Sequence, residues 1–257
     1  MMRDFIPRLR MFAGPNGSGK TTVKNALQKP ASWFGVYINP DDLEQEIRAN
    51  GVLSLAPFEV STSTEEVWSY FASSEFLSSQ NLVAASDSIT CRDEKLSFGN
   101  IDFNSYHASV LADFLRRKAM EAGKSFTFET VMSSRDKVLL LEEARERGFR
   151  TYLYFMATED PEINIQRVKN RVANGGHDVP ERKIIDRYHR SLALLTEALR
   201  HTNRAYLFDT SEDKPWFFAE ITDNTAIELS GEIPRWFSPI WKQFDMESAE
   251  SSSPPKP

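Results

Sequence analysis

The chain has 257 residues, 40% hydrophobic and 26% charged, a balance that excludes a globally disordered protein and provides for a full-sized core. Its 31 basic and 37 acidic residues give a net charge of −6, which argues against a nucleic-acid-binding surface. There is no apolar run of membrane-spanning length and, near the N-terminus, no apolar segment typical of a secretion signal, so we expect a cytoplasmic protein without a membrane partner. The chain has one cysteine, Cys91, so we expect neither an intrachain disulfide nor a cysteine-bound metal.

A phosphate-binding loop follows the first predicted strand. The apolar stretch 9–13 predicts a short buried strand, and residues 22–28 predict a helix that ends before Pro30. Between them, residues 14–21 fit the pattern Gly-x-x-x-x-Gly-Lys-[Ser/Thr] at every position. Glycines let backbone N–H groups surround phosphate oxygens, so we expect Lys20 to reach the β- and γ-phosphates of ATP and Thr21 to bind Mg²⁺. The predicted nucleotide-binding residues are Gly14, Pro15, Asn16, Gly17, Ser18, Gly19, Lys20, Thr21 and Thr22.

Polar residues come directly after the second predicted strand, 35–38. Pro40 prevents this strand from continuing inside a sheet, and a helix is predicted to begin near Asp42. Asn39, Asp41 and Asp42 therefore lie at the carboxyl end of a strand, where open parallel sheets bind ligands. The alternative role for Asp41 and Asp42 is helix capping, with one of them capping while the other faces the site.

The next region, 52–105, has no clear pattern. Val67, Trp68 and Phe71 indicate at least one amphipathic helix, and the region is interpreted as an insertion that could cover the substrate. A clearer helix is predicted over 109–122, where apolar residues have helical spacing and Gly123 ends the run.

A third strand is predicted at 126–130, where Phe126 and Phe128 alternate with polar residues before Glu129. Glu129 could orient Mg²⁺-bound water or a substrate hydroxyl, or it could be a solvated carboxylate at the end of the strand. A helix over 136–147 follows it. The fourth strand, 152–156, is apolar throughout, as expected of a strand buried on both faces.

Basic residues surround a double-glycine break after the fourth strand: Arg167, Lys169, Arg171, His177, Arg182, Lys183 and Arg187. A helix is predicted over 162–174, with Arg167 and Arg171 on one face, and Gly175-Gly176 ends it. His177 and Pro180 precede a long amphipathic helix that extends to Leu199. We expect residues 162–190 to form a lid that closes over phosphates and contributes cations to the transition state. The alternative is an ordinary solvated helical face.

The C-terminal part predicts a fifth strand, 205–209, and a hairpin, 217–222 with 225–229. The aromatic residues of 234–244 are expected to pack back on the domain, and 245–257 to be a disordered tail. Recurring strand–helix units predict an α/β P-loop NTPase fold, a three-layer sandwich with a five-stranded, mostly parallel sheet and a helical lid. The predicted domain spans 1–244.

These motifs together resemble the zeta-toxin family of P-loop kinases, in particular the branch regarded as predicted ATPases. The resemblance covers roughly residues 8–212. It is carried by segments 14–22, 38–41, 126–130, 167–171 and 175–180. The phosphate loop alone is shared by many families, whereas the ordered set of five is much more specific.

The resemblance implies an ATP- and Mg²⁺-dependent kinase that phosphorylates a sugar hydroxyl, as in UDP-N-acetylglucosamine, or the adenosine ribose of a dinucleotide, and it implies that an antitoxin protein could be a partner. It assigns Asp41 as the catalytic base and Arg167 as a transition-state arginine. It assigns Glu129 as a substrate-side carboxylate, with Asn39 and Thr130 beside the substrate. The family's second arginine is replaced here at His177, so His177, Arg171 or Arg182 takes that role, or the lid works differently. Two alternatives remain: a P-loop ATPase that acts through a protein partner, and a nucleic-acid end kinase, which the acidic balance disfavours.

Overall fold

The computed structural model describes residues 6–83, 88–99, 101–176 and 178–242. The chain divides into two compact units: Met1–Lys29 with Glu129–Pro257, and Pro30–Phe128. The predicted insertion, 52–105, lies inside the second of these units, and the predicted phosphate loop and lid lie inside the first. Within the described residues, no helix combines the length and the apolar character that crossing a membrane requires.

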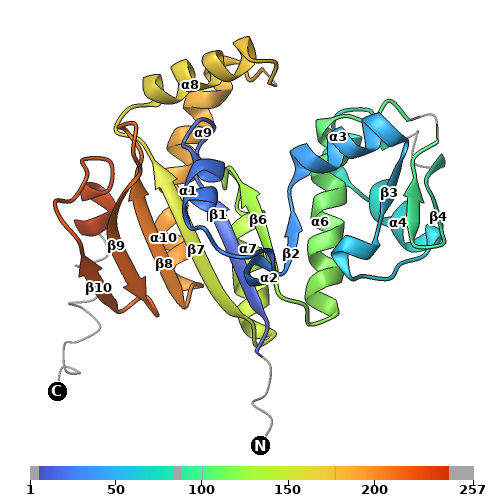
Figure 1. Cartoon of the computed structure of the whole chain (residues 1–257), viewed down its shortest axis with the longest axis horizontal. Coiled ribbons are helices and arrows are strands. Elements are labelled where there is room, and N and C mark those ends of the chain that lie inside the picture. Colours follow the sequence, from blue (N-terminus) through green and yellow to red (C-terminus); the bar gives the residue numbers. More distant parts are fainter. Residues whose placement is uncertain (1–5, 84–87, 100, 177, 243–257) are drawn as a thin grey trace, which may run out of the picture. The chain divides into compact units, whose positions relative to one another are not determined.

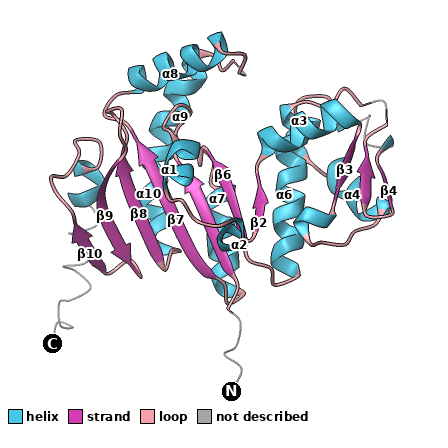
Figure 2. Cartoon of the chain, viewed as in Figure 1, coloured by secondary structure: helices cyan, strands magenta, loops and turns pink. Residues whose placement is uncertain are grey.

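Five strands lie wholly in the first unit (Figure 2). The first three run parallel: Met11 of the first strand is opposite Leu153 of the second, and Leu153 is opposite Ala205 of the third. Most of their buried positions are filled by apolar side chains, as expected of central strands; the polar exceptions are Arg10, Thr151 and Asp209. The last two strands form the predicted hairpin, whose Asp223 and Asn224 have φ of 47° and 56°, as a type I′ turn requires. The strands are β1 (Arg8–Ala13), β7 (Arg150–Ala157), β8 (Arg204–Asp209), β9 (Trp216–Thr222) and β10 (Ala226–Leu229).

The helices of the first unit cover the sheet and the carboxyl ends of its parallel strands (Figure 1). The long helix predicted to reach Leu199 is interrupted at Leu194 and forms two helices, α9 and α10. The aromatic segment packs back as predicted: Phe237 is fully buried, and Trp236 Nε1 donates to Asp209 Oδ2 at 2.8 Å. The end of that segment and the predicted tail, 245–257, lie outside the described residues. The helices are α1 (Lys20–Ala26), α7 (Asp136–Glu146), α8 (Pro161–Ala173), α9 (Glu181–Ala193) and α10 (Leu195–Arg200).

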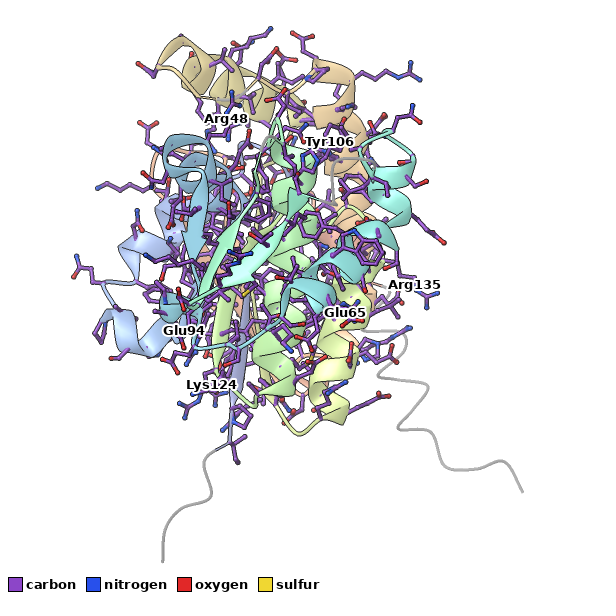
Figure 3. The ribbon with its side chains drawn as sticks, turned by 90° about the vertical axis from the view of Figure 1, so that its right-hand side faces the viewer. Arg48, Glu65, Glu94, Tyr106, Lys124 and Arg135 are labelled. Atoms are coloured by element: carbon purple, nitrogen blue, oxygen red, sulfur yellow. The ribbon has the colours of Figure 1, made fainter. Side chains whose placement is uncertain are left out.

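The second unit contains a small sheet that the sequence analysis did not predict. Its three strands are antiparallel, in the order β3-β5-β4, and each is only three residues long. Helix α6 begins at Ser105, earlier than predicted, because Asn104 caps it and the His107 side chain completes a capping box. Figure 3 shows this unit with Lys124, which pairs with Glu59 at 2.9 Å. Its elements are α2 (Ala31–Phe34), β2 (Val36–Ile38), α3 (Pro40–Asn50), β3 (Val52–Ser54), η1 (Ala56–Phe58), α4 (Thr64–Ala72), α5 (Glu75–Ser78), β4 (Thr90–Arg92), β5 (Lys95–Ser97) and α6 (Ser105–Glu121).

The remaining strand, β6 (Phe126–Thr130), pairs in parallel with β2 through its first three residues. The hydrogen-bonded order of the large sheet is β10-β9-β8-β7-β1-β6-β2. The predicted mixed α/β class with a mostly parallel sheet is confirmed. The strand count of five is wrong, because the C-terminal hairpin continues the sheet and brings it to seven strands.

Candidate functional site

The phosphate-loop sequence folds into a tight turn between β1 and α1. Gly14 N donates to Thr130 O at 3.3 Å, which fastens the start of the loop to the end of β6. A Cβ atom at Gly14 would lie 2.0 Å from Met156 O, and one at Gly17 would lie 2.6 Å from Asn164 O. Only glycine fits at these two positions, because the backbone of neighbouring elements occupies the space of a side chain.

Lys20 lies over the start of this loop. Its Nζ donates to Gly14 O at 2.9 Å and to Pro15 O at 3.0 Å. The ammonium group is therefore held beside the N-terminal half of the loop rather than extended into solvent. A phosphate chain bound along the loop would meet this charge at the same end.

Glu129, at the end of β6, is in contact with the first helix after the loop. Its Oε2 accepts a hydrogen bond from Thr21 Oγ1 at 2.9 Å, and its Oε1 is 3.4 Å from Lys24 Nζ. Its side chain is 9% exposed. The interpretation of Glu129 as a solvated carboxylate is therefore wrong, since the side chain is largely buried and hydrogen-bonded beside Thr21.

The Thr21 and Glu129 oxygens fit the ligand preference of Mg²⁺. This ion prefers oxygen ligands, usually keeps several waters, and binds through one or two carboxylates together with substrate phosphates. Among the described residues there is no group of three or more His, Cys, Asp or Glu side chains that could hold a metal without such a substrate. Thr21 and Glu129 are thus suited to a metal that arrives with a nucleotide.

Helix α8 presents one face to the loop. Asn164 Nδ2 donates to Asn16 O at 2.6 Å, and Arg167, one turn further along, shares that face. Arg167 Nη2 contacts two backbone carbonyls after β8, Ser211 O at 3.3 Å and Glu212 O at 3.1 Å. Arg171, the next arginine of α8, is exposed. The structure therefore brings Arg167 to the neighbourhood of the loop through a helix that contacts it directly.

Three residues outside the predicted site contact the loop: Asn164, Thr210 and Arg187, the last of which belongs to the predicted basic lid. Thr210 Oγ1 donates to Ser18 O at 3.0 Å, and Arg187 Nη1 of α9 donates to Asn16 Oδ1 at 3.3 Å. Their separation from the loop along the chain hides these contacts in the sequence. Two of them carried a signal: Arg187 is one of the basic residues of the predicted lid, and Asn164 precedes Arg167 by one helical turn.

The predicted polar cluster after β2 lies in the second unit. Asn39 Oδ1 accepts from Asp41 N at 3.2 Å, so Asn39 is the N-cap of α3. The proposal that Asp41 or Asp42 caps the helix is wrong, and both carboxylates are exposed in its first turn. Acidic groups at this position stabilise the helix through its dipole. Asn39, and not Asp41, therefore caps this helix.

The remaining residues singled out in the sequence are Thr22, Thr130, His177 and Cys91. Thr130 Oγ1 accepts from Met132 N at 3.1 Å, which shapes the turn after β6, and Thr22 is exposed in the first turn of α1. His177 lies outside the described residues. Burial raises the pKa of the Cys91 thiol, which argues against a reactive thiolate.

Comparison with known proteins matches part of the chain to one family model. Residues 100–211 match the family model of the Zeta toxin. The resemblance to the zeta toxin family is confirmed. An uncharacterized protein of Haemophilus influenzae is 33% identical over 63 residues, which are 24% of this chain and 45% of that protein.

Solved structures with a similar fold include two of low sequence identity. The crystal structure of AvrRxo1-ORF1:AvrRxo1-ORF2 with sulphate ions aligns with a TM-score of 0.52 at 13% identity and covers 94% of this chain. The AvrRxo1-ORF1:-ORF2 structure with ATP has a TM-score of 0.51 at 15% identity and the same coverage. This chain spans 64% of the length of either matched chain. A PezAT structure from Streptococcus pneumoniae aligns with a TM-score of 0.47 at 14% identity, over 95% of this chain and 85% of the other.

Proposed function

We propose that this protein is an ATP-dependent kinase that transfers the γ-phosphoryl group to a hydroxyl of a small sugar- or ribose-containing acceptor. The observation that carries the proposal is the hydrogen bond between Thr21 and Glu129 at 2.9 Å, beside a complete phosphate loop. The hydroxyl and the carboxylate are the kinds of group that bind Mg²⁺ together with a nucleotide, which supports a nucleotide-dependent reaction at this loop. The match to the Zeta toxin family model and the ATP bound in the AvrRxo1 structure support ATP as the phosphoryl donor.

The proposed mechanism assigns each charged group a task. The acceptor oxygen attacks the γ-phosphorus, the bond to the β–γ bridging oxygen breaks with its electron pair leaving on ADP, and the hydroxyl proton passes to the Asp41 carboxylate. Lys20 and Arg167 neutralise charge on the phosphoryl oxygens. Thr21 and Glu129 would hold Mg²⁺, which would neutralise further negative charge on the phosphates when bound. Such a reaction depends on positioning and electrostatics more than on covalent help from the protein.

The proposed role of Asp41 is supported by strand register. Ile38 of β2 is the partner of Phe128 of β6 within the second unit, so Asn39 and Asp41 follow the carboxyl end of a parallel strand. Ligands of open parallel sheets bind at the carboxyl ends of the strands. Asn39 and Thr130 are proposed to border the acceptor, and Glu129 to act on the metal or on the acceptor hydroxyl.

The match to the Zeta toxin family model also supports the proposal that the chain binds an antitoxin protein. The competing function is a P-loop ATPase that acts through such a partner. The two differ in where the γ-phosphoryl group goes, because a kinase makes a phosphorylated metabolite and an ATPase makes only inorganic phosphate.

The experiment uses ATP labelled on its γ-phosphate, Mg²⁺ and a small-molecule extract, with products separated and identified by mass spectrometry. The wild-type chain should form a phosphorylated metabolite. Lys20→Ala should abolish turnover while the thermal unfolding temperature stays near that of the wild type. Asp41→Asn should keep nucleotide affinity and lose transfer, with Asp42→Asn as the matched control. Full transfer by Asp41→Asn would remove Asp41 from the role of base, and hydrolysis without any labelled metabolite would favour the ATPase.

A further inference from the structure

A basic residue of α9 that no family assignment covers reaches the phosphate loop. Arg187 Nη1 donates to the side-chain oxygen of Asn16 at 3.3 Å. Arg187 is half-buried, whereas Arg182, Lys183 and Arg190 of the same helix are exposed. Among the described basic residues of α9, Arg187 therefore stands apart by its burial and by its contact with the loop.

The backbone on both sides of Arg187 is anchored in the core, which fixes the direction of its side chain. Ile184, one turn before it, packs into a buried cluster with Ile165 and Val168 of α8. Tyr188, directly after it, is buried and donates from its hydroxyl to Thr158 O at 2.6 Å. One turn further, Ser191 Oγ donates to a backbone carbonyl at 2.9 Å. A helix held at these points cannot rotate, so the Arg187 side chain is presented to the loop by rigid structure.

The loop end of the contact is equally fixed. Asn16 O accepts the 2.6 Å hydrogen bond from Asn164, and Asn164 is itself hydrogen-bonded to Thr158 Oγ1. Thr158 thus holds both partners: its carbonyl binds Tyr188 next to Arg187, and its hydroxyl binds Asn164 beneath the loop. One buried residue thus links the helix that carries Arg187 to the loop that carries Asn16.

Two cationic side chains contact consecutive residues at this end of the loop. Lys20 Nζ contacts the carbonyls of Gly14 and Pro15, and Arg187 contacts the next residue, Asn16. The phosphate-loop lysine is the group that meets the β- and γ-phosphates. A guanidinium at the adjacent residue is therefore close to where the transferred phosphoryl group would lie. Its planar array of N–H donors suits the oxygens of a phosphoryl group.

We propose that Arg187 is a second catalytic arginine, which neutralises the phosphoryl group in transfer together with Arg167, and that Asn16 holds it in position. This inference rests on the proposed kinase function. It replaces His177, Arg171 and Arg182 as the group that fills the place of the family's second arginine. The competing explanation is that the Arg187–Asn16 hydrogen bond only ties α9 to the loop.

The test compares Arg187→Ala with Arg187→Lys and with the control Arg190→Ala, whose side chain is exposed and hydrogen-bonds within its own helix to Asp186 O at 3.3 Å. Three quantities are measured in the presence of Mg²⁺: phosphoryl transfer, ADP affinity, and affinity for ADP with aluminium fluoride, which imitates the transferring phosphoryl group. Arg187→Ala should lower transfer by at least about 100-fold and abolish the gain in affinity from aluminium fluoride, because arginines of this kind contribute about 10³–10⁵ in rate. ADP affinity and thermal stability should stay near those of the wild type.

Further results separate the two roles of Arg187. Arg187→Lys should retain part of the activity, since it keeps the charge but loses the planar donor array, and added guanidinium should partly rescue Arg187→Ala. Full transfer by Arg187→Ala overturns the proposal. So does an equal loss of ADP affinity and aluminium fluoride affinity with a lowered unfolding temperature, which is the result of a purely structural tie. A wild-type chain without transfer refutes the kinase function itself, and Arg187 is then judged by the aluminium fluoride binding alone.

Discussion

Substitution of Gly17 by alanine tests whether the phosphate loop is packed against α8. Gly17 and Gly19 both have φ of +75°, so an alanine at either position adopts a left-handed conformation, which costs about 1–2 kcal/mol. The surroundings of the two glycines differ. A Cβ at Gly17 would lie 2.6 Å from Asn164 O, whereas one at Gly19 would approach only Thr22, at 3.9 Å.

The structure therefore predicts a difference between two alanine variants that share the same backbone strain. Forcing a side chain into packed structure adds about 1–3 kcal/mol at position 17. The total is then about 2–5 kcal/mol for Gly17→Ala and about 1–2 kcal/mol for Gly19→Ala. With about 2–4 °C per kcal/mol for a chain of this size, Gly17→Ala should unfold about 2–12 °C below Gly19→Ala.

The assay is thermal unfolding followed by circular dichroism, without nucleotide, so that contacts with a bound phosphate do not enter. A lower unfolding temperature for Gly17→Ala supports the packing of the loop on Asn164. Equal unfolding temperatures for the two variants would refute it. The arrangement of α8 and α9 around the loop, on which the roles of Arg167 and Arg187 depend, would then have to be abandoned.

Two further predictions concern the residues beside the loop. Glu129→Gln keeps the size of the side chain but removes the negative charge beside Thr21 and Lys24. The Mg²⁺ concentration for half-maximal turnover should therefore rise about 10–100-fold. An unchanged Mg²⁺ requirement would exclude Glu129 from the metal site. Burial, and after it the negative charge of Glu159, raises the pKa of Tyr188 to about 12, so the stability that its neutral hydroxyl provides is complete below about pH 10 and is lost as the pH rises to about 12. Tyr188→Phe should remove this pH dependence and lower the free energy of unfolding by about 1–3 kcal/mol, because Thr158 O loses its hydrogen-bond donor. A denaturant titration at pH 8 and at pH 11 measures both effects. A variant with the same pH response as the wild type would contradict the role given to the Tyr188 hydroxyl.

The parts of the fold that the sequence predicted are those set by local rules. The strand, loop and helix around Gly14–Thr21 follow from a motif whose residues are adjacent, and β7 follows from a continuous apolar run. The Asp223-Asn224 turn follows from two residue types that tolerate positive φ. In each case the deciding interactions lie within a few residues.

The parts that could not be predicted depend on contacts between distant segments. Strands β3, β4 and β5 have three residues each, too few for an alternating pattern to stand out. The compact unit Pro30–Phe128 is defined by contacts within a long segment that has no composition boundary. By contrast, Asn39 as the cap of α3 was within reach of the sequence, because a cap residue followed by proline is a helix-start signal.

The candidate site divides in the same way. The loop residues, and Lys20 and Thr21 among them, were predicted from the motif. The contacts of Asn164, Thr210 and Arg187 with the loop were not, since they join residues 148, 192 and 171 positions apart. Such contacts are set by how α8, α9 and the end of β8 pack at the edge of the sheet.

The most direct test of the central claim follows the oxygen atoms of the transferred group. The wild-type chain is incubated with ATP, Mg²⁺ and a small-molecule extract in water enriched in heavy oxygen, and the products are analysed by mass spectrometry. A kinase moves the γ-phosphoryl group to an acceptor hydroxyl, so the phosphorylated metabolite should contain no solvent oxygen in that group. Inorganic phosphate carrying one solvent oxygen as the main product, with no phosphorylated metabolite, would contradict the account and indicate an ATPase.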